Sequence, residues 1–264
     1  MSTPDQLFRD GDLTGAVAAL TAEVKSAAAD AGRRTFLFEL LAFAGELDRA
    51  GRQLDVIGQL DGKAEPTVQV YRNLLDAERT RQKVLAGGAR PEFLIDPPGW
   101  MADQLQAIEH LKAGRPADAA ASLALGESRR QPLQGTRGET PFVSFRDCDD
   151  LLAPVLEFML IRDYLWVPFE QLAEIEVLPP EYPRDLLWSP VRLTLRDGTD
   201  HRGFVPALYD GSSRHADDQV RLGRATDWIA ASDAPVRGVG QRLFLVGESD
   251  CGLLELGKVA FSNL

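Results

Sequence analysis

A short motif that returns at a fixed spacing constrains the fold of this chain most strongly. The run from Gly11 to Ala16 recurs 34 residues later as the run from Gly45 to Ala50, and each is followed by a leucine four residues on. A third, weaker copy, with Arg115 in place of the acidic residue, begins at Gly114, 69 residues further on and close to two more periods. Each glycine suits the left-handed end of one helix, and the acidic residue after it suits the start of the next. The motif therefore predicts pairs of antiparallel helices.

A period of 34 residues is typical of tetratricopeptide repeats, helix–turn–helix units that stack into a superhelix and commonly bind other proteins. We predict helix pairs over residues 3–29, 33–60 and 100–129, and a long helix over 66–87 that continues the stack. The outer face of that long helix is expected to carry Arg72, Arg79, Arg81 and Lys83.

The composition changes near residues 131–139, where alanine becomes scarce and β-branched and aromatic residues become more frequent. The predicted fold is therefore multidomain, α and α+β. A tetratricopeptide-like α–α superhelix occupies residues 1–130, and an α+β domain with a small, mostly antiparallel sheet occupies 131–264. Expected there are a helix over 151–162, a hairpin turn at Asp197-Gly198, and strands over 140–144, 164–167, 173–177, 191–195, 201–206, 242–247 and 252–256.

Composition and charge also limit the classes of function. Hydrophobic residues make up 44% of the 264 residues and charged residues 26%, which is typical of soluble globular proteins. No apolar run approaches the ~20 residues of a membrane span, and the N-terminus lacks the features of a targeting signal. We expect a cytoplasmic protein. The net charge of −11, with both halves acidic, disfavours binding to nucleic acids or anionic membranes.

Residues suited to catalysis or metal binding are scarce in this sequence. No histidine pair has the spacing of a helical metal site, and the two cysteines are far apart and are expected to be reduced thiols. Asp147, Asp149 and Asp150 do not match a calcium loop, and we interpret them as a solvated acidic face at the start of a helix. A Gly-x-Ser-x-Gly elbow is missing as well. We therefore assign no catalytic residue, metal or cofactor and expect a protein that is not an enzyme.

Several runs along nearly the whole chain resemble the ImpE family, also called TagJ, accessory components of bacterial type VI secretion systems. The matching runs are Phe36 to Leu41, Gln53 to Asp55, Pro154 to Glu157, Tyr164 to Glu170, Pro183 to Trp188, Leu222 to Trp228 and Gly240 to Arg242. The resemblance implies a cytoplasmic non-enzyme that binds the N-terminal region of the small sheath subunit TssB. It further implies an effect on sheath assembly or on disassembly by the ATPase ClpV. No functional residue is carried over from the family, and the oligomeric state stays open.

A binding surface can be predicted from the repeat geometry. The first helices of successive pairs line the concave face of such a stack, where a partner helix is held by its apolar stripe. The positions expected to face that groove are Thr35, Glu39, Phe43, Met101, Gln104 and Ile108. The alternative is that Phe43 and Ile108 belong to the core between repeats.

A competing hypothesis places an enzyme or a small-ligand-binding module in the C-terminal domain, with the helical repeats as a scaffold. Such a module needs a concave pocket with converging polar groups. The candidates for its lining are Arg184, Asp185, Arg224 and Asp227.

Overall fold

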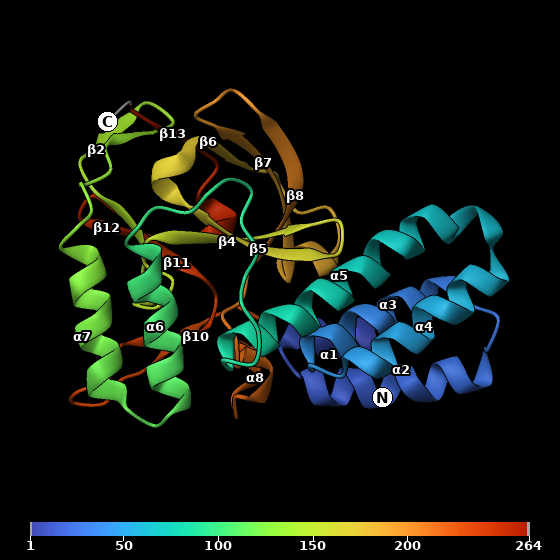
Figure 1. The fold of residues 1–264 in the computed structure, drawn as a ribbon. Helices are drawn as coiled ribbons and strands as arrows, with labels where there is room; N and C mark the ends of the chain where they lie inside the picture. The colour runs from blue at the N-terminus through green and yellow to red at the C-terminus, as the bar shows by residue number, and fades with distance from the viewer. Residues whose placement is uncertain (1, 263–264) are drawn as a thin grey trace.

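The computed structural model describes residues 2–262, and its N-terminal half is helical (Figure 1). Each of the predicted helix pairs is confirmed, as is the long helix that follows the second pair. The helices are α1 (Pro4–Asp10), α2 (Leu13–Ser26), α3 (Ala31–Phe43), α4 (Leu47–Leu60), α5 (Glu65–Leu85), α6 (Met101–Lys112), α7 (Pro116–Glu127) and the short α8 (Asp218–Arg221).

The repeated glycines end the first helix of each pair. Gly11, Gly45 and Gly114 have φ angles of 87°, 73° and 67°, a left-handed conformation that costs glycine least. After Gly11, the side chain of Asp12 begins α2 by accepting a 2.6 Å hydrogen bond from the backbone N–H of Gly15. The spacing of glycines thus sets the spacing of the helix turns.

The helical half consists of two separate groups. Helices α1 to α5 pack against one another in sequence order and form a row. The α6–α7 hairpin lies apart from that row, below the sheets in the view of Figure 1. Between the two groups, Glu92 bridges to β5 (Asp163–Pro168), the edge strand of the large sheet, where its carbonyl accepts a 2.9 Å hydrogen bond from the N–H of Trp166. The third pair therefore does not extend the row, as a continuous superhelix would require.

Up to residue 262, the C-terminal half contains three antiparallel sheets. The largest has eight strands in the order β2-β1-β13-β6-β7-β8-β4-β5, the second pairs β10 with β9, and the third has the order β12-β11-β3. The strands are β1 (Gly135–Arg137), β2 (Thr140–Phe142), β3 (Phe145–Asp147), β4 (Val155–Leu160), β5 (Asp163–Pro168), β6 (Leu172–Val177), β7 (Trp188–Leu195), β8 (Asp200–Pro206), β9 (Thr226–Ile229), β10 (Arg237–Gly240), β11 (Leu243–Val246), β12 (Ser249–Gly252) and β13 (Lys258–Phe261). The antiparallel arrangement and the hairpin at Asp197-Gly198 are confirmed, but the main sheet is larger than predicted.

Two local predictions are wrong. Residues 151–162 do not form a helix: turns lead into β4, which pairs with β5 along its length and with β8 at Met159. Both faces of β4 are buried, so its apolar run lacks the alternation that marks a half-exposed strand. Residues 252–256 do not form a strand either. β12 ends at Gly252, and a 3-10 turn over Leu253–Glu255 follows.

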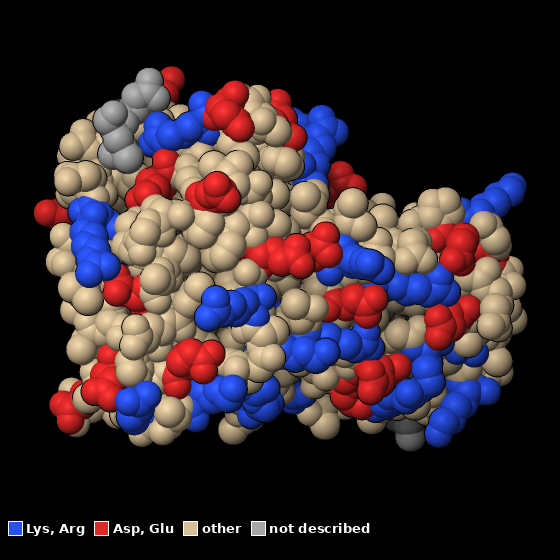
Figure 2. All heavy atoms as spheres, viewed as in Figure 1, with Lys and Arg blue, Asp and Glu red and all other residues tan. Residues whose placement is uncertain are grey.

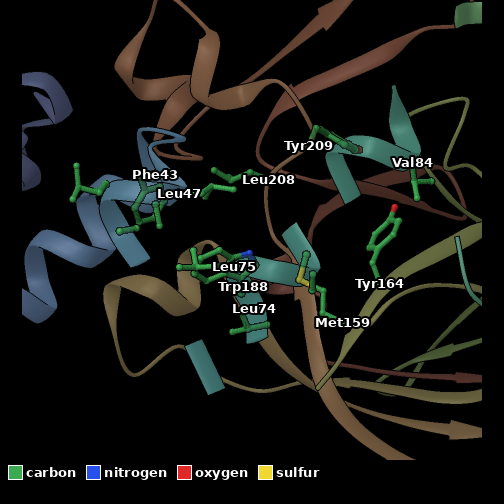
Figure 3. Close-up of a cluster of buried hydrophobic side chains, with 14 of the residues drawn as sticks. Phe43, Leu47, Leu74, Leu75, Val84, Met159, Tyr164, Trp188, Leu208 and Tyr209 are labelled. Atoms are coloured by element: carbon green, nitrogen blue, oxygen red, sulfur yellow. The ribbon is translucent and has the colours of Figure 1, made fainter. Parts of the chain in front are cut away.

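The two faces of the large sheet are buried in different cores. On one face, Val155 and Met159 of β4 join the helices in a shared hydrophobic cluster, which includes Leu74 and Leu75 of α5 (Figure 3). On the other face, Leu156 and its neighbours join a second cluster rich in phenylalanine. Helix α5 thus lies against the sheet, and hydrophobic contacts cross the boundary predicted from composition.

Candidate functional site

A buried network of charged side chains lies where α5 meets the large sheet. Arg81 of α5 donates from Nε to Glu157 Oε1 of β4 at 2.8 Å, and Arg242, just before β11, donates to the other oxygen of the same carboxylate. Arg81 also donates to the carbonyl of Leu208 at 2.9 Å. The exposed fractions are 3% for Arg81 and 0% for both Glu157 and Arg242. One carboxylate therefore joins two arginines from opposite halves of the chain.

Tyrosines and a second carboxylate complete this network. The hydroxyl of Tyr164 donates to Glu157 and accepts a 2.7 Å hydrogen bond from the indole N–H of Trp166. Arg242 Nη1 donates to Asp147 Oδ2 at 3.0 Å, and the Tyr209 hydroxyl donates to Asp147 Oδ1 at 2.8 Å. The polar atoms of the network are thus satisfied by one another, as buried charges require.

The pKa values of the two buried carboxylates shift in opposite directions. Burial alone would raise the pKa of Glu157, but its two arginine partners, Arg81 and Arg242, lower that pKa to about 2. Asp147 has a single arginine partner and lies next to Asp149, so burial dominates and raises its pKa to about 7. Glu157 is therefore a fixed anion, whereas Asp147 titrates near neutral pH.

The acidic group at 147–150 is therefore not the solvated face predicted from the sequence. Asp147 and Asp149 are both fully buried, and Asp149 binds Arg237 at 2.8 Å and the N–H of Gly238 at 3.0 Å. Asp150 is half-buried and accepts the N–H of Val236 at 2.8 Å. These carboxylates attach the β10 region to the turn before β4. Within residues 2–262, no group of three or more His, Cys, Asp or Glu side chains is placed to hold a metal ion.

A cavity of about 40 Å³ adjoins the network, room for a few water molecules at most. Its lining includes Phe43 of α3, Arg81 of α5, Trp188 of β7 and the loop through Leu208 and Tyr209, and several of these side chains appear in Figure 3. Because the ionised groups already bind one another, the cavity offers no unpaired acid, base or nucleophile from this network. The arrangement fixes the helical row to the sheet.

This network was not predicted from the sequence, although several of its members lie in motifs described above. Arg81 was predicted on the solvated face of its helix, but it lies on the buried stripe, three residues before Val84 and three after Glu78. That spacing was the available signal, since positions three and four apart share one helix face. Glu157 and Arg242 both fall within the runs that carry the family resemblance.

Five of the six residues predicted to face a partner lie in the interior. The exposed fractions of Glu39, Phe43, Met101, Gln104 and Ile108 are 3%, 1%, 1%, 3% and 3%. Thr35 is half-buried and donates its hydroxyl to the carbonyl of Ala31 at 2.9 Å. The first three of the six lie on α3 and the last three on α6, in separate helix groups, so they do not line one groove. The burial of Phe43 and Ile108 matches the alternative in which they are core residues.

The four residues predicted to line a C-terminal pocket have other partners. Arg184 forms a 2.7 Å ion pair with Glu39 of α3, and Asp185 accepts the N–H groups of Glu181 and Tyr182. Arg224 donates to the carbonyls of Phe8 and Arg9 at the end of α1, and Asp227 lies 3.3 Å from His215. Arg184 and Arg224 therefore attach the C-terminal half to the helical row at two different places.

A groove lies between α7 and the turns of the C-terminal half. Its volume is about 260 Å³, and its lining is mixed. Ala120, Leu123, Ala124 and Glu127 come from α7, and Ala153, Pro154, Ala234 and Pro235 come from the C-terminal half. Gln104 of α6 contributes to the groove lining and donates its amide to the carbonyl of Leu151. Arg146 and Asp150, paired at 2.7 Å, form a polar part of the rim. A groove that combines apolar side chains with charged ones offers contacts to both faces of an amphipathic peptide.

The outer surface of the helical row is charged but not of one sign. On the face shown in Figure 2, acidic and basic side chains alternate over α4 and α5. Arg72 pairs with Asp55 and Glu65, and Arg79 pairs with Asp48. Among the described residues, no helix is long and apolar enough to cross a bilayer.

These features define a class of protein: helix pairs joined to an antiparallel sheet by buried ion pairs. The crystal structure of protein VPA1032 from Vibrio parahaemolyticus has the same fold, with a TM-score of 0.90, 23% identity, and coverage of 98% of this chain and 97% of that one.

Sequence comparisons identify the family. The family model described as ImpE protein matches residues 139–260. The type VI secretion system accessory component TagJ of Pseudomonas aeruginosa strain PAO1 is 39% identical over 258 residues, which cover 97% of this chain and 90% of TagJ. The chain belongs to the ImpE/TagJ family of type VI secretion accessory components, as its sequence runs indicated.

Proposed function

We propose that this protein is a non-catalytic, cytoplasmic accessory component that binds the N-terminal region of the small sheath subunit TssB. Through that contact it modulates sheath assembly or ClpV-dependent disassembly. The observation that carries the proposal is the 39% identity to a type VI secretion accessory component along 97% of the chain. The mutual pairing of the buried charges supports a binding role over a catalytic one.

The groove between α7 and the C-terminal turns is the binding surface that we assign to the sheath segment. Of the six residues predicted from the repeat geometry, Gln104 is the one that contributes to this groove. The apolar stripe of an amphipathic helix would contact Leu123, Ala124 and Pro154, while its polar face would remain in water.

The proposal is tested by calorimetry with a synthetic peptide of the TssB N-terminal segment from the same secretion cluster. We expect saturable binding with a negative heat-capacity change, the mark of apolar burial. Ala124→Glu places a charge in the groove and should weaken binding by about tenfold or more, equivalent to about 1.4 kcal/mol. Ala121→Glu is the matched control, because Ala121 is exposed on α7 but does not line the groove.

Two results would contradict this assignment. If no heat of binding is detected at several temperatures, the TssB segment is not the partner. Equal affinity in the Ala124→Glu and Ala121→Glu variants would retain the partner but exclude the groove.

A further inference from the structure

Strand β9 has an open edge. β9 pairs only with β10 within the described residues, and its residues Trp228 and Thr226 lie opposite Gly238 and Gly240. The N–H groups of those two glycines donate elsewhere, to Asp149 at 3.0 Å and to the Ser212 hydroxyl at 2.7 Å. Because hydrogen-bonded pairs alternate along an antiparallel ladder, β10 bonds the other two residues of β9. The backbone groups of Thr226 and Trp228 therefore face away from β10.

That open edge differs from the two ends of the large sheet. At one end, β2 contains Pro141, which has no N–H to offer a new strand. At the other end, β5 is bridged by Glu92. β9 has neither form of protection: the N–H of Trp228 is met by the adjacent, exposed carboxylate of Asp227 at 2.8 Å. A strand arriving from outside would need to displace that single local contact.

Apolar side chains flank the open edge. Trp228 is 38% exposed and Ile229 is 61% exposed, and the other three tryptophans are 5% exposed or less. The ring centroids of Trp228 and Tyr209 lie 6.0 Å apart, and this contact joins the strand to the body of the protein. Exposed aromatic and β-branched residues beside unpaired backbone groups are the features that an added strand uses.

The charges around the edge indicate which strand would fit. Asp227 on β9, Asp233 in the turn after it and Asp217 before α8 are exposed. Within residues 2–262 none of them forms an ion pair with a lysine or arginine, although Asp227 lies 3.3 Å from His215 and Asp217 accepts the N–H of Gln219. A second copy of this chain would bring the same carboxylates against one another, which is unfavourable. A segment that alternates apolar residues with Lys or Arg would instead complement them.

We infer that β9 is a second binding surface, which takes an extended, basic and apolar segment of another protein as an added antiparallel or parallel strand. The backbone of Thr226 and Trp228 would supply the ladder, Trp228 and Ile229 the apolar contacts, and the three aspartates the charge selectivity. This inference does not depend on the sheath-subunit proposal, which concerns a different surface and a helical ligand.

The test uses the full chain and an eight-residue peptide of alternating Lys and Val, titrated by NMR and by tryptophan fluorescence. We expect saturable binding that weakens with salt, shifts of the Thr226 and Trp228 amides, and a fluorescence change from Trp228. A peptide of alternating Glu and Val should bind at least tenfold more weakly. A Lys–Val peptide with a central proline should lose binding as well, because it cannot complete the ladder.

Protein variants locate the binding. Ile229→Ser should weaken binding of the Lys–Val peptide severalfold, and Asp233→Asn should weaken it about twofold. Glu139→Gln, which neutralises an exposed carboxylate in the β1–β2 turn, should leave the affinity unchanged. Ala124→Glu should leave this peptide unaffected, which separates the two surfaces. The inference is overturned if the Lys–Val peptide does not saturate, or if it binds the Ile229→Ser variant equally well. It is also overturned if sedimentation shows a dimer that Ile229→Ser dissociates, since β9 would then bind a second copy.

Discussion

The arginine–carboxylate pairs on the two faces of α5 contain the same chemical groups in opposite environments. Arg79 on the outer face pairs with Asp48 at 2.9 Å, with 35% and 85% of the two side chains exposed. Arg81 on the inner face pairs with Glu157 at 2.8 Å, with 4% and 0% exposed. Water competes far more strongly for the first pair than for the second. The distance within an ion pair therefore says little about its contribution to the free energy of unfolding. The buried pair fixes the position of α5 against β4.

Replacing Arg81 and Arg79 one at a time should give the largest difference in stability between the two faces of α5. Arg81→Ala leaves two carboxylates, Glu78 and Glu157, buried with less compensation, and we expect it to lower the free energy of unfolding by about 3–5 kcal/mol. Arg79→Ala removes an exposed partner two residues away on the same helix and should cost no more than about 1 kcal/mol. Urea unfolding of both variants, followed by circular dichroism, makes the comparison. Equal losses would mean that the buried network does not hold the two halves together.

A second test uses pH, because the network contains a carboxylate that titrates in an unusual range. The pKa of Asp147 is about 7 in the folded state and 3.8 ordinarily, so the folded protein keeps this proton between those values while the unfolded chain releases it. The contribution of Asp147 to the free energy of unfolding is fully present below about pH 4. It declines as the pH rises from there through 7, by a few kcal/mol at most. On the outer surface, by contrast, the hydrogen bond from Arg33 lowers the pKa of Asp5. The contribution of Asp5 to stability is therefore lost as the pH falls, not as it rises.

The measurement is the free energy of unfolding between pH 4.5 and 8, in the wild type and in Asp147→Asn. Asparagine still accepts hydrogen bonds from Arg242 and Tyr209 but does not titrate, so we expect the variant to lose the decline attributed to Asp147. If both proteins show the same pH dependence across this window, Asp147 is ionised throughout and the ion pair with Arg242 outweighs its burial.

The same contrast explains what the sequence could and could not predict. The helix ends follow from Gly11, Gly45 and Gly114, because a left-handed glycine acts locally. The buried network depends on Arg81 meeting Glu157, 76 residues later in the chain, and Arg242, a further 85 residues on. No periodicity within one element encodes such a meeting, although the position of Arg81 on an apolar stripe hinted at it. The placement of α6 and α7 was missed for a similar reason, since the segment before them pairs at Glu92 with Leu165, far along the chain.

The smallest expected effect concerns an unfavourable feature on the outer surface. Ile161, at the tip of the β4–β5 hairpin, has a φ angle of 57° and is 70% exposed. A β-branched residue is strained in that conformation, and it buries little here in return. Ile161→Gly should raise the free energy of unfolding by about 1 kcal/mol, because glycine adopts this conformation freely. Ile161→Ala keeps the Cβ atom and should gain much less. If both variants lower the stability, contacts of the isoleucine side chain outweigh the backbone strain. The exposed fraction of a side chain would then predict its contribution to stability as poorly as distance does for the ion pairs of α5.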